Sequence, residues 1–505
     1  MPKITIKEID NTRSTSETYS NFSVVVPGFT SSDADTSVFD ENGVYEVSSK
    51  DDFLAHIGKV RSVARDAKAP TLVELTSDSG ETTLERTLTH EEAFITYADH
   101  VYKRTDCSAS NGYLSSSATT DTCLKGMYKK VSANDFQDTL PYCVILTGDE
   151  GNDKETYSSF GNQIAYELVT NLGYTVLYKK LSTIEDLDNK AFWEALKDRA
   201  NYDFRYICTG LVDNNKNAND RIAELADFVN GSSDTGRGDC IALLDVSNDV
   251  YSSSKTQNEN IAAIISDISL SFKAATKYSA ILAPTVIYDR TEDEVYKNNA
   301  LPASFHYLVC AAEAFETYPE WFAVAGYTRG VSANYKVLKT TVTFGEAAIN
   351  ALEPRYKKTD GPSKAVNLVA KIKNSYYLWG NRTAHDLEEK DDAAGTGDLK
   401  ASHFLNIRQL CCTIKKQLYL NCRKFTFEPN SDVLWINFTN AIEPLLEKMK
   451  ANQGIEDYKV IKVKTSQKAT FSAIIRIVPI EAVEDFDLTV TLEDSISGAT
   501  VEVEE

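Results

Sequence analysis

The chain has 505 residues, with 53 Lys and Arg against 74 Asp and Glu, which gives a formal net charge of −21. At roughly 150 residues per domain this length indicates about two to four domains. The composition, 42% hydrophobic and 25% charged, is typical of folded protein and excludes wholesale disorder, collagen and coiled coil.

The charge and hydropathy also exclude several partners. A pI near 4.9 argues against direct binding of nucleic acid, because phosphate contacts need clustered positive charge. No stretch approaches the roughly 18 uncharged apolar residues of a membrane helix, so we expect no membrane insertion. The N-terminal sequence lacks the apolar run of a signal peptide, so we expect a protein made in a cytosol.

The nine cysteines do not form a metal or disulfide pattern. None is part of a CxxC pair, and the six histidines are scattered along the chain. Cys208, Cys240 and Cys310 lie within apolar runs, where free cysteine usually acts as a small core residue. We therefore expect reduced structural thiols, no metal site and no cofactor.

The first 135 residues contain two predicted strands and a polar region. In residues 3–9 the apolar residues alternate with polar ones, as in a half-buried strand, and a polar tether follows. Residues 22–29 (FSVVVPGF) predict a second strand that ends at a Pro-Gly turn. Residues 81–135 are rich in Ser and Thr with few apolar runs, which favours a surface insertion.

From residue 136 the pattern becomes that of an α/β domain. Short apolar runs alternate with helix-like segments, which predicts a mostly parallel sheet with crossover helices. We place a domain boundary in the charged, Gly-containing loop 385–398. The apolar runs are YCVILTG, YTVLYKK, FRYICTGL, CIALLDV and YSAILAPTVI, and the helix-like segments include FGNQIAYELVTNLG and NENIAAIISDISLSFKAATKY.

The C-terminal region predicts two helices followed by strands. In the first helix, apolar residues from Ile407 to Leu418 fall in one arc, and a basic arc lies beside it. The second helix begins after good N-capping residues at 430–432 and contains Pro444, where we expect a kink or a restart. The basic arc contains Arg408, Lys415, Lys416 and Arg423, and the strands are YKVIKVKT, ATFSAIIRIVP, FDLTVTLE and TVEVE.

Charge is unevenly distributed between this region and the rest of the chain. Residues 400–480 contain thirteen Lys and Arg and six Asp and Glu, or 13 − 6 = +7, so the remainder carries −21 − 7 = −28. A basic module on an acidic protein indicates a face that meets an acidic surface. The alternative is an ordinary solvated charged face.

Motifs of known chemistry are absent or imperfect. The sequence has no phosphate-binding G-x-x-x-x-G-K-[ST] loop, no G-x-S-x-G elbow and no H-E-x-x-H zinc motif. Asp213, Asn215, Asn217 and Glu224 imitate a calcium-binding loop, but Ala218 occupies the position where the sharp turn requires Gly. We interpret this stretch as a polar surface loop, and we expect a protein that is not an enzyme.

Two further short motifs have simpler interpretations as turns. Asp245, Ser247 and Asp249 follow an apolar strand, close to the D-x-S-x-S pattern of metal-dependent adhesion domains, although the last residue is Asp where Ser is expected. A strand-end turn capped by Asp and Ser side chains is the plainer interpretation. Residues 237–239 (RGD) lie in a Gly/Ser-rich stretch and are also interpreted as a turn rather than an adhesion motif.

Three stretches in sequence order carry a family resemblance. Residues 318–331 (YPEWFAVAGYTRGV) precede 376–383 (YYLWGNRT), which is similar to a W-G-x-R-T signature. Residues 404–460 then resemble the N-x-R-x-L helix, F-E-P-N turn, tryptophan helix and Gly-rich exit of contractile tail sheath proteins. The order of the pieces over roughly 190 residues makes the joint match specific. The motif residues are Trp379, Gly380, Arg382, Arg408, Glu428, Pro429, Asn430 and Trp435.

The resemblance implies a structural subunit rather than an enzyme. Such subunits stack as hexameric rings around a tail tube and contract to drive the tube through a host envelope. It implies a virion-tail protein assembled in the host cytoplasm, with itself, the tube protein, baseplate and tail terminator or neck proteins as partners. The motif residues would hold shape, which is also what ordinary packing would have them do.

It also implies a layered, multidomain α/β and α+β subunit. The expected parts are an N-terminal linker arm (1–20), an α/β middle core (21–80 and 136–390), an outward insertion (81–135), an inner C-terminal domain (399–485) and a C-terminal arm (486–505). We expect the basic arc, Arg408, Lys415, Lys416 and Arg423, to face the tube. The terminal strands would pair with neighbouring subunits through Ile4, Ile6, Ile9, Leu488, Val490, Leu492, Val501 and Val503, or else within their own subunit.

Two alternatives stay open at this point. The chain resembles the sheaths of non-phage contractile injection systems equally well. In a different class, it is a cytosolic α/β enzyme or metal-dependent adhesion domain that uses the acidic strand ends around Asp213 or Asp245.

Overall fold

The structure is a computed structural model that contains sheets and helices throughout its described part. One eight-stranded sheet, one three-stranded sheet and three two-stranded pairs occur within it. This mixed α/β architecture confirms the predicted α/β class. The described residues are 23–28, 30, 34–57, 60–62, 72–76, 82–86, 144–146, 164–170, 172–210, 218–231, 236–288, 300–358, 360–387, 399–463 and 469–482.

The eight-stranded sheet is mostly parallel, as predicted. Its order is β15-β14-β10-β9-β8-β1-β7-β2, and only the edge strands β15 and β2 pair antiparallel with their neighbours. Strand β1 is the first strand of this sheet in the sequence, and β2 and β7 lie on one side of it. The later strands are added on the other side from β8 outward, so the direction of winding reverses between β1 and β8. The bounds are β1 Ser23–Gly28, β2 Val44–Val47, β7 Thr175–Lys180, β8 Tyr206–Cys208, β9 Ile241–Asp245, β10 Ser279–Ala283, β14 Asn367–Ile372 and β15 Ser375–Trp379.

Both faces of this sheet are covered by helices, and its strands are therefore apolar at almost every position. Successive side chains of a strand point to opposite faces. In β1, Val25 belongs to the core cluster that includes side chains of α6, α7, α8 and α11, while Val24 and Val26 belong to the cluster that includes side chains of α1, residues 164–170 and α9. These helices are α1 Lys50–His56, α6 Lys190–Glu194, α7 Ala218–Val229, α8 Gln257–Ser271, α9 Ala303–Thr317 and α11 Glu346–Leu352, with α10 Gly326–Arg329 beside β15 and 3-10 turns at Thr36–Val38, Ile184–Asp188 and Ala195–Lys197.

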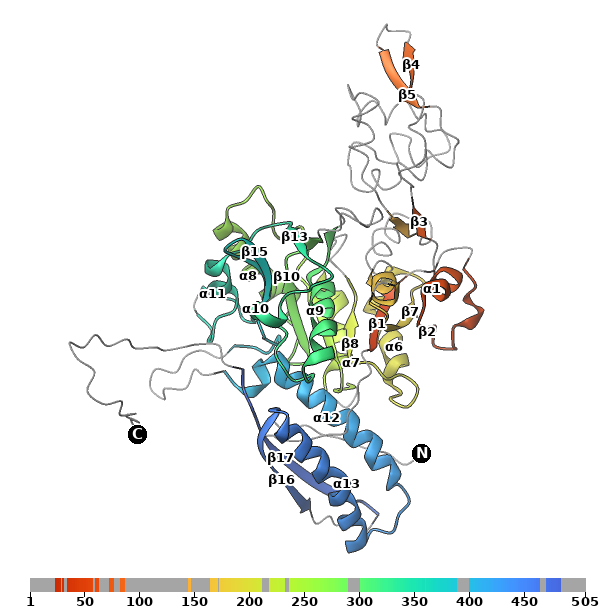
Figure 1. Ribbon diagram of the computed structural model, residues 1–505, viewed down its shortest axis with the longest axis vertical. Coiled ribbons are helices and arrows are strands. Elements are labelled where there is room, and N and C mark those ends of the chain that lie inside the picture. The colour runs from red at the N-terminus through yellow and green to blue at the C-terminus, as the bar shows by residue number, and fades with distance from the viewer. Residues whose placement is uncertain are drawn as a thin grey trace, which may run out of the picture.

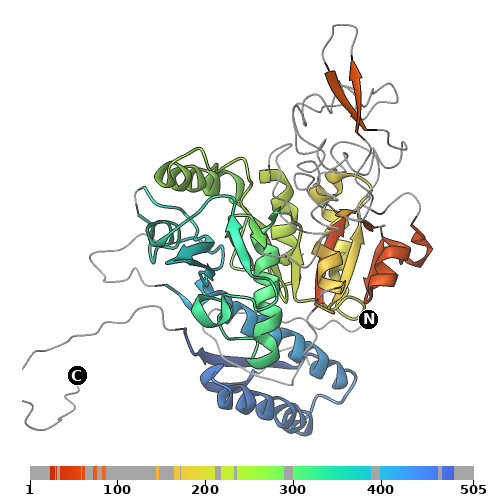
Figure 2. The ribbon, with the colours of Figure 1, turned by 45° about the horizontal axis from the view of Figure 1, so that its top comes forward.

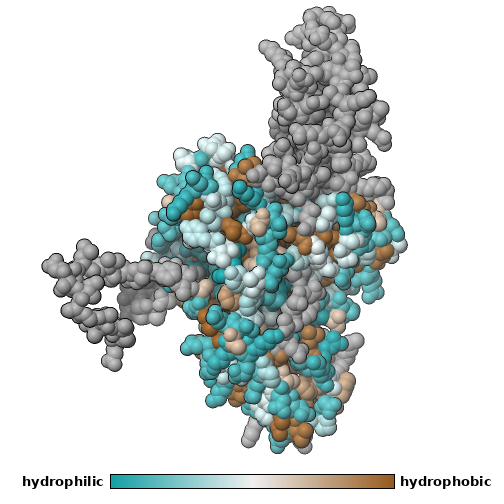
Figure 3. Space-filling model, viewed as in Figure 1, coloured by the Kyte–Doolittle hydropathy of each residue, from teal (hydrophilic) through white to brown (hydrophobic). Residues whose placement is uncertain are grey.

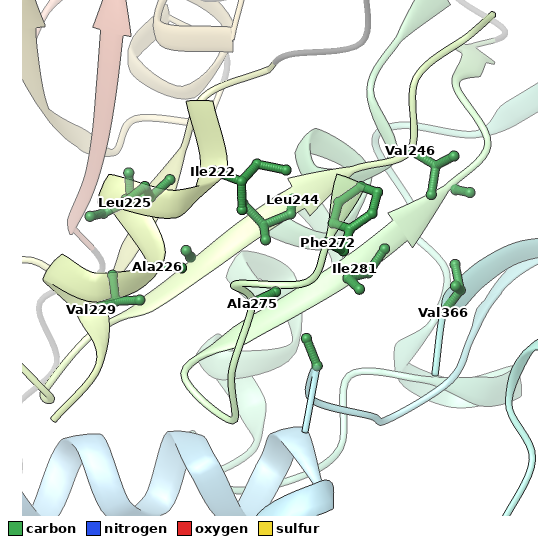
Figure 4. Close-up of a cluster of buried hydrophobic side chains, with 14 of the residues drawn as sticks. Ile222, Leu225, Ala226, Val229, Leu244, Val246, Phe272, Ala275, Ile281 and Val366 are labelled. Atoms are coloured by element: carbon green, nitrogen blue, oxygen red, sulfur yellow. The ribbon is translucent and has the colours of Figure 1, made fainter. Parts of the chain in front are cut away.

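The start of α8 shows how local sequence sets these helices. Thr256 Oγ1 accepts a hydrogen bond from the Glu259 amide at 3.3 Å, and the Glu259 carboxylate accepts one from the Thr256 amide at 2.8 Å. This reciprocal capping satisfies amides that the first turn leaves without partners. Ile261, Ile264 and Ile268 of α8 belong to the same core cluster as the residues drawn in Figure 4. There Leu244 of β9 lies beside Ile222 of α7, and Ile281 of β10 lies near Phe272, the residue that follows α8.

Three smaller sheets complete the region before residue 387. A three-stranded sheet has the order β12-β11-β13 (Ala300–Leu301, Val286–Tyr288 and Val337–Thr340). The run YCVILTG was predicted as part of the main sheet, but its strand β6 (Val144–Leu146) pairs antiparallel with β3 (Val60–Ser62) in a separate pair. The third, β4 and β5 (Leu72–Thr76 and Thr82–Arg86), forms a hairpin that stands away from the sheets (Figure 1). This hairpin spans the predicted insertion boundary at residue 81.

The C-terminal module, residues 399–482, contains the predicted two helices and hairpin. After a 3-10 turn at Ala401–His403, α12 (Leu405–Lys424) and α13 (Asp432–Ala451) precede the antiparallel strands β16 (Ile455–Val463) and β17 (Ser472–Pro479). Ser431 caps α13 by accepting a hydrogen bond from the Leu434 amide, as its sequence predicted. In Figures 1 and 2, α12 lies between the main sheet and the rest of the module.

The restart expected at Pro444 as one of two outcomes is wrong: α13 is one continuous helix from Asp432 to Ala451. Proline removes one backbone hydrogen bond within a helix. On either side of Pro444, however, Ile442 and Leu446 are completely buried against the hairpin. Burying such side chains contributes about 1.5–3 kcal/mol each, enough to hold both turns in one helix.

Candidate functional site

The basic arc of α12 is buried, not exposed. Arg408, Lys415 and Lys416 expose only 1%, 7% and 6% of their surface, whereas Arg423 near the helix end is exposed. The prediction that the arc faces a tube is therefore wrong for the first three residues. Their side chains enter the junction, which we define as the contact between α12 and the end of the main sheet.

The buried lysines bind groups of the sheet domain. Lys415 Nζ donates to the Gly238 carbonyl and to the Tyr278 hydroxyl, both at 2.9 Å. Lys416 forms an ion pair with Asp203. The Arg408 guanidinium lies over the Tyr278 ring, 4.5 Å from its centroid. The contacts of the two lysines hydrogen-bond or neutralise cations that would be costly to bury alone, and the face of the Tyr278 ring attracts the Arg408 guanidinium.

A second group in the junction centres on Arg205, which immediately precedes β8. Its guanidinium donates to Thr413 Oγ1 at 3.0 Å and lies 2.6 Å from the Glu320 carboxylate. Thr413 in turn donates to Glu320 at 2.8 Å. Burial acts to lower the pKa of Arg205, but the neighbouring Glu320 carboxylate more than offsets it, so the pKa is raised and the arginine stays charged.

Gln409 completes this polar surface. Its amide donates to the hydroxyls of Tyr206, at 2.8 Å, and Tyr307. Burial raises the pKa of both tyrosines well above the ordinary value, which keeps the hydroxyls protonated. Gln409, Thr413, Lys415 and Lys416 of α12 thus each bind a group of the sheet domain, which fixes the position of the helix against the sheet.

The Arg-Gly-Asp stretch is a buried loop segment between α7 and β9 with a bend at Asp239, so it is not an exposed adhesion motif. Arg237 donates to Asp239 at 2.7 Å and to the carbonyls of Leu196 and Tyr202. Burial acts to raise the pKa of Asp239, but Arg237 and Lys416 outweigh it and lower the pKa. Gly238 has φ +70°, and a Cβ there would lie 2.4 Å from the Gly231 backbone. This loop segment presents the Gly238 carbonyl that Lys415 binds.

The acidic strand ends considered for metal binding do not form a metal site in the described residues, where no group of three His, Cys, Asp or Glu side chains has a suitable arrangement. Asp245 is buried and accepts hydrogen bonds from the amide and hydroxyl of Ser304 at the start of α9. The amide of exposed Asp249 donates to Ser247 at 3.5 Å, as expected for a strand-end turn. Asp213, Asn215 and Asn217 lie outside the described residues, and Glu224 lies on α7.

The thiols of the predicted core positions are buried as expected. Cys208, Cys240 and Cys310 have no exposure or 1% exposure. Burial raises the pKa of Cys208 and Cys240 to about 12, so these thiols stay protonated and poorly nucleophilic.

The motif residues near 321 and 380 tie the sheet domain to the module. Trp321 donates to the Asn452 carbonyl at 3.0 Å, and a Cβ at Gly454 would lie 2.8 Å from the Trp321 ring. Gly380 has φ +132°, beside half-buried Trp379 at the end of β15. The buried Arg382 guanidinium lies 4.9 Å from the centroid of the Phe404 ring.

The F-E-P-N turn joins α12 to α13 at the far end of the module. Glu428, Pro429 and Asn430 are exposed, and Asn430 donates to the Thr470 carbonyl at 3.2 Å. Trp435 packs against Phe438 and Phe471 beneath the hairpin. Phe427 is 89% exposed and adopts φ +75°, a region in which non-glycine residues are uncommon.

Sequence analysis missed the partners in the junction, although one signal pointed to them. Residues 405–424 contain five Lys and Arg and no Asp or Glu. A solvated helix commonly pairs opposite charges three or four positions apart. The absence of Asp and Glu from this helix indicated that its polar side chains find their partners in other parts of the chain. That these partners include Asp203, Tyr278 and Glu320 depended on long-range folding. The predicted arm residues, Ile4, Ile6, Ile9, Leu488, Val490, Leu492, Val501 and Val503, lie outside the described residues.

The module corresponds to a known protein family. Residues 400–493 match the phage tail sheath C-terminal domain, which confirms the resemblance predicted from the motifs over this range. Within the described residues, no helix has the length and apolar character needed to cross a membrane.

Solved structures also resemble the chain. A chain of the anti-feeding prophage baseplate, 6-fold symmetrised, is 12% identical with a TM-score of 0.48 over 98% of this chain and 99% of that one. A chain of the PVC sheath complex of an extracellular contractile injection system, in the contracted state, is 13% identical with a TM-score of 0.48 over 98% of both. A chain of the contracted anti-feeding prophage baseplate is 16% identical with a TM-score of 0.42, over 64% of this chain and 80% of that one. No curated protein matches the chain.

Proposed function

We propose that the protein is the structural subunit of a contractile tail sheath, which polymerises as stacked hexameric rings around a tail tube. The observation that carries this proposal is the match of residues 400–493 to the phage tail sheath C-terminal domain. The motifs upstream of it, in the predicted order, support the same function for the remaining chain.

In this proposal the chain forms layers around the tube. The C-terminal domain (399–485) is the inner layer, the α/β region (21–80 and 136–390) is the middle one, and residues 81–135 project outward. The extended contact through α12 supports a subunit whose two parts move together. Arg423, the exposed member of the basic arc, retains the proposed role at the tube surface.

Terminal arms would link the subunits. The hairpin β16–β17 is a two-stranded sheet in the described residues, and a sheet of this size is marginal alone. Its outer edges can each accept one more strand. Residues 1–20 and 486–505 contain the alternating patterns that suit such strands.

Contraction would need no nucleotide. The extended array is then a metastable packing set during assembly, and new contacts between subunits in the contracted packing supply the work. The partners are other copies of the chain, the tube protein, and the baseplate and tail terminator or neck proteins. Assembly would take place in the host cytoplasm, before the finished tail is part of a virion.

Negative-stain electron microscopy of the purified protein at high concentration, with and without EDTA, tests the proposal. We expect hollow, striated tubes in both conditions. Discrete particles that never polymerise, destabilised by EDTA, would instead support an α/β enzyme or metal-dependent adhesion domain. Deleting residues 1–18 should leave a folded monomer that does not form tubes.

The nearest alternative is a sheath of a non-phage contractile injection system, which works by the same mechanics. The tube and baseplate proteins encoded beside this chain distinguish the two particles. A companion tube protein that copurifies with sheath polymers would identify the particle by its own sequence.

A further inference from the structure

The outer face of the β16–β17 hairpin is uncovered in the described residues and mostly apolar. Alternate residues of both strands, including Val460 and Ile475, pack beneath α13. The residues between them point the other way, and on β17 and just beyond it Ile474, Val478 and Ile480 are 37%, 48% and 41% exposed. The solvated face of an antiparallel sheet is ordinarily polar, so this one indicates a contact with another segment.

Two cations lie at the centre of this face. Lys459 and Arg476 are directly opposite each other across the hairpin, and both are exposed. The ion pairs on the described hairpin join Lys450 to Asp457 and Lys462 to Asp432, and neither includes the two central cations. Like charges at directly opposite positions destabilise a strand pair. A segment that brings carboxylates beside them would relieve this repulsion.

The C-terminal end of the sequence has this chemistry. Residues 481–505 contain nine Asp and Glu and no Lys or Arg. In its first half, apolar and polar residues alternate with the period of a strand. One side would carry Phe486, Leu488, Val490 and Leu492, and the other Asp485, Asp487, Thr489, Thr491 and Glu493.

We infer that Lys459 and Arg476 select the acidic C-terminal arm of a second copy of the chain as the strand that docks beside them on the hairpin. With its apolar side turned to the α13 core, the arm presents Asp485 and Asp487 on the outer face, the face that carries the two cations. The inference rests on the proposed strand exchange, and it adds which arm binds there and what fixes its position.

Charge excludes the other arm from this place. The polar side of the N-terminal strand carries Lys3, Thr5 and Lys7. Docked beside Lys459 and Arg476, it would add two cations to an existing pair of cations. The N-terminal strand instead suits a position next to the acidic arm, so the hairpin distinguishes two strands that have the same hydrophobic alternation.

Charge reversal in the full-length chain tests whether Lys459 and Arg476 select the C-terminal arm. We expect Lys459→Glu with Arg476→Glu to raise the concentration needed for tube formation about tenfold, the sum of a few cross-strand charge pairs. The same change in charge at exposed Lys336 and Lys339 of the sheet domain is the control, and it should leave that concentration unchanged. In 1 M salt the difference between the wild type and the hairpin variant should shrink, because screening weakens exposed charge pairs.

Complementary variants identify the partner as a second copy. Asp485→Lys with Asp487→Lys should also impair assembly, whereas the chain with all four substitutions should recover it. An equimolar mixture of the two impaired double variants should form tubes, because each arm then meets an opposite charge only on the other variant. Recovery by the four-substitution chain without recovery in the mixture would show pairing within one chain and overturn the role of a second copy.

Two other outcomes distinguish a failure of this inference from a failure of the proposed sheath function on which it rests. If wild-type chains form tubes and the hairpin variant forms them at the same concentration, the selection by Lys459 and Arg476 is wrong and the sheath proposal stands. If wild-type chains form no tubes at any concentration, with or without a tube protein, the sheath proposal itself fails.

Discussion

The C-terminal module has two basic surfaces, one on α12 and one on the hairpin, and they differ in what surrounds the charges. On α12, Arg408, Lys415 and Lys416 are buried and held by partners from the sheet domain. On the hairpin, Lys459 and Arg476 are exposed and face each other. The first surface therefore joins two parts of one chain, and the second is available to another chain.

The difference has an energetic basis. A cation removed from water needs a hydrogen-bonding or charged partner, so the α12 surface is stable only when the sheet domain is folded against it. Exposed cations cost little in water, and their mutual repulsion is a small penalty that a bound carboxylate removes. Substitutions in the junction should thus change folding, and substitutions on the hairpin should change assembly.

Removing Arg205 should have the largest effect on folding. Arg205→Ala leaves the Glu320 carboxylate and Thr413 without their cation at the junction. Loss of one partner of a buried ion pair costs about 3–5 kcal/mol of unfolding free energy. Urea unfolding followed by circular dichroism measures this loss. Exposed Arg423→Ala, with a change within about 0.5 kcal/mol, is the matched control.

A pH titration tests the buried carboxylate of Asp245, whose pKa, unlike that of Asp239 beside Arg237, is shifted by no cation among the described residues. Burial raises the pKa of Asp245 to about 7, against hydrogen bonds from Ser304 that act to lower it. Between pH 4 and 7 the folded chain therefore holds a proton that the unfolded chain has released, and this group lowers the unfolding free energy as pH rises.

Relative to the wild type, Asp245→Asn should gain stability across this window and show no further change above it. Unfolding at a series of pH values measures the difference between the two proteins, in which other titrations cancel. Exposed Asp249→Asn should show no such trend. A difference for Asp245→Asn that is constant from pH 4 to 8 would rule out the raised pKa.

Gly454→Val should weaken the second contact between the module and the sheet domain. A Cβ at this position would lie 2.8 Å from the Trp321 ring, so the ring must move from the turn that it contacts. Overpacking of this kind costs about 1–3 kcal/mol. Unfolding should report that loss, and quenching of tryptophan fluorescence should increase as Trp321 becomes accessible. The variant Trp321→Phe with Gly454→Val should recover part of the stability.

The smallest effect, with the opposite sign, should follow substitution on the hairpin. Lys459→Ala removes the repulsion across the strand pair from Arg476 and should leave the monomer unchanged or more stable by about 0.2–1 kcal/mol. The same variant should form tubes less readily. A loss of monomer stability as large as that of Arg205→Ala would contradict the distinction between the two basic surfaces.

Much of the secondary structure followed from local patterns. The apolar runs predicted the strands at 23–28, 175–180, 206–208, 241–245 and 279–283, and the periodicity predicted α12, α13 and the hairpin. The motif order predicted the match at 400–493. These features depend on the spacing of neighbouring residues, which a sequence displays directly.

Long-range placement decided the rest. The spacing of Arg408, Lys415 and Lys416 showed a basic arc on α12, and this arc is present. Whether such an arc meets water or protein depends on the residues that fold against it, here Asp203, Gly238 and Tyr278, which lie at least 130 positions away from it. The strand order of the sheet also depends on contacts between distant residues. So does the helix at Pro444, which continues because the hairpin covers residues on both sides of the proline. Sequence by itself determined the elements and the family resemblance, whereas the tertiary structure determined which charges are buried, because burial is a property of all the segments that pack together.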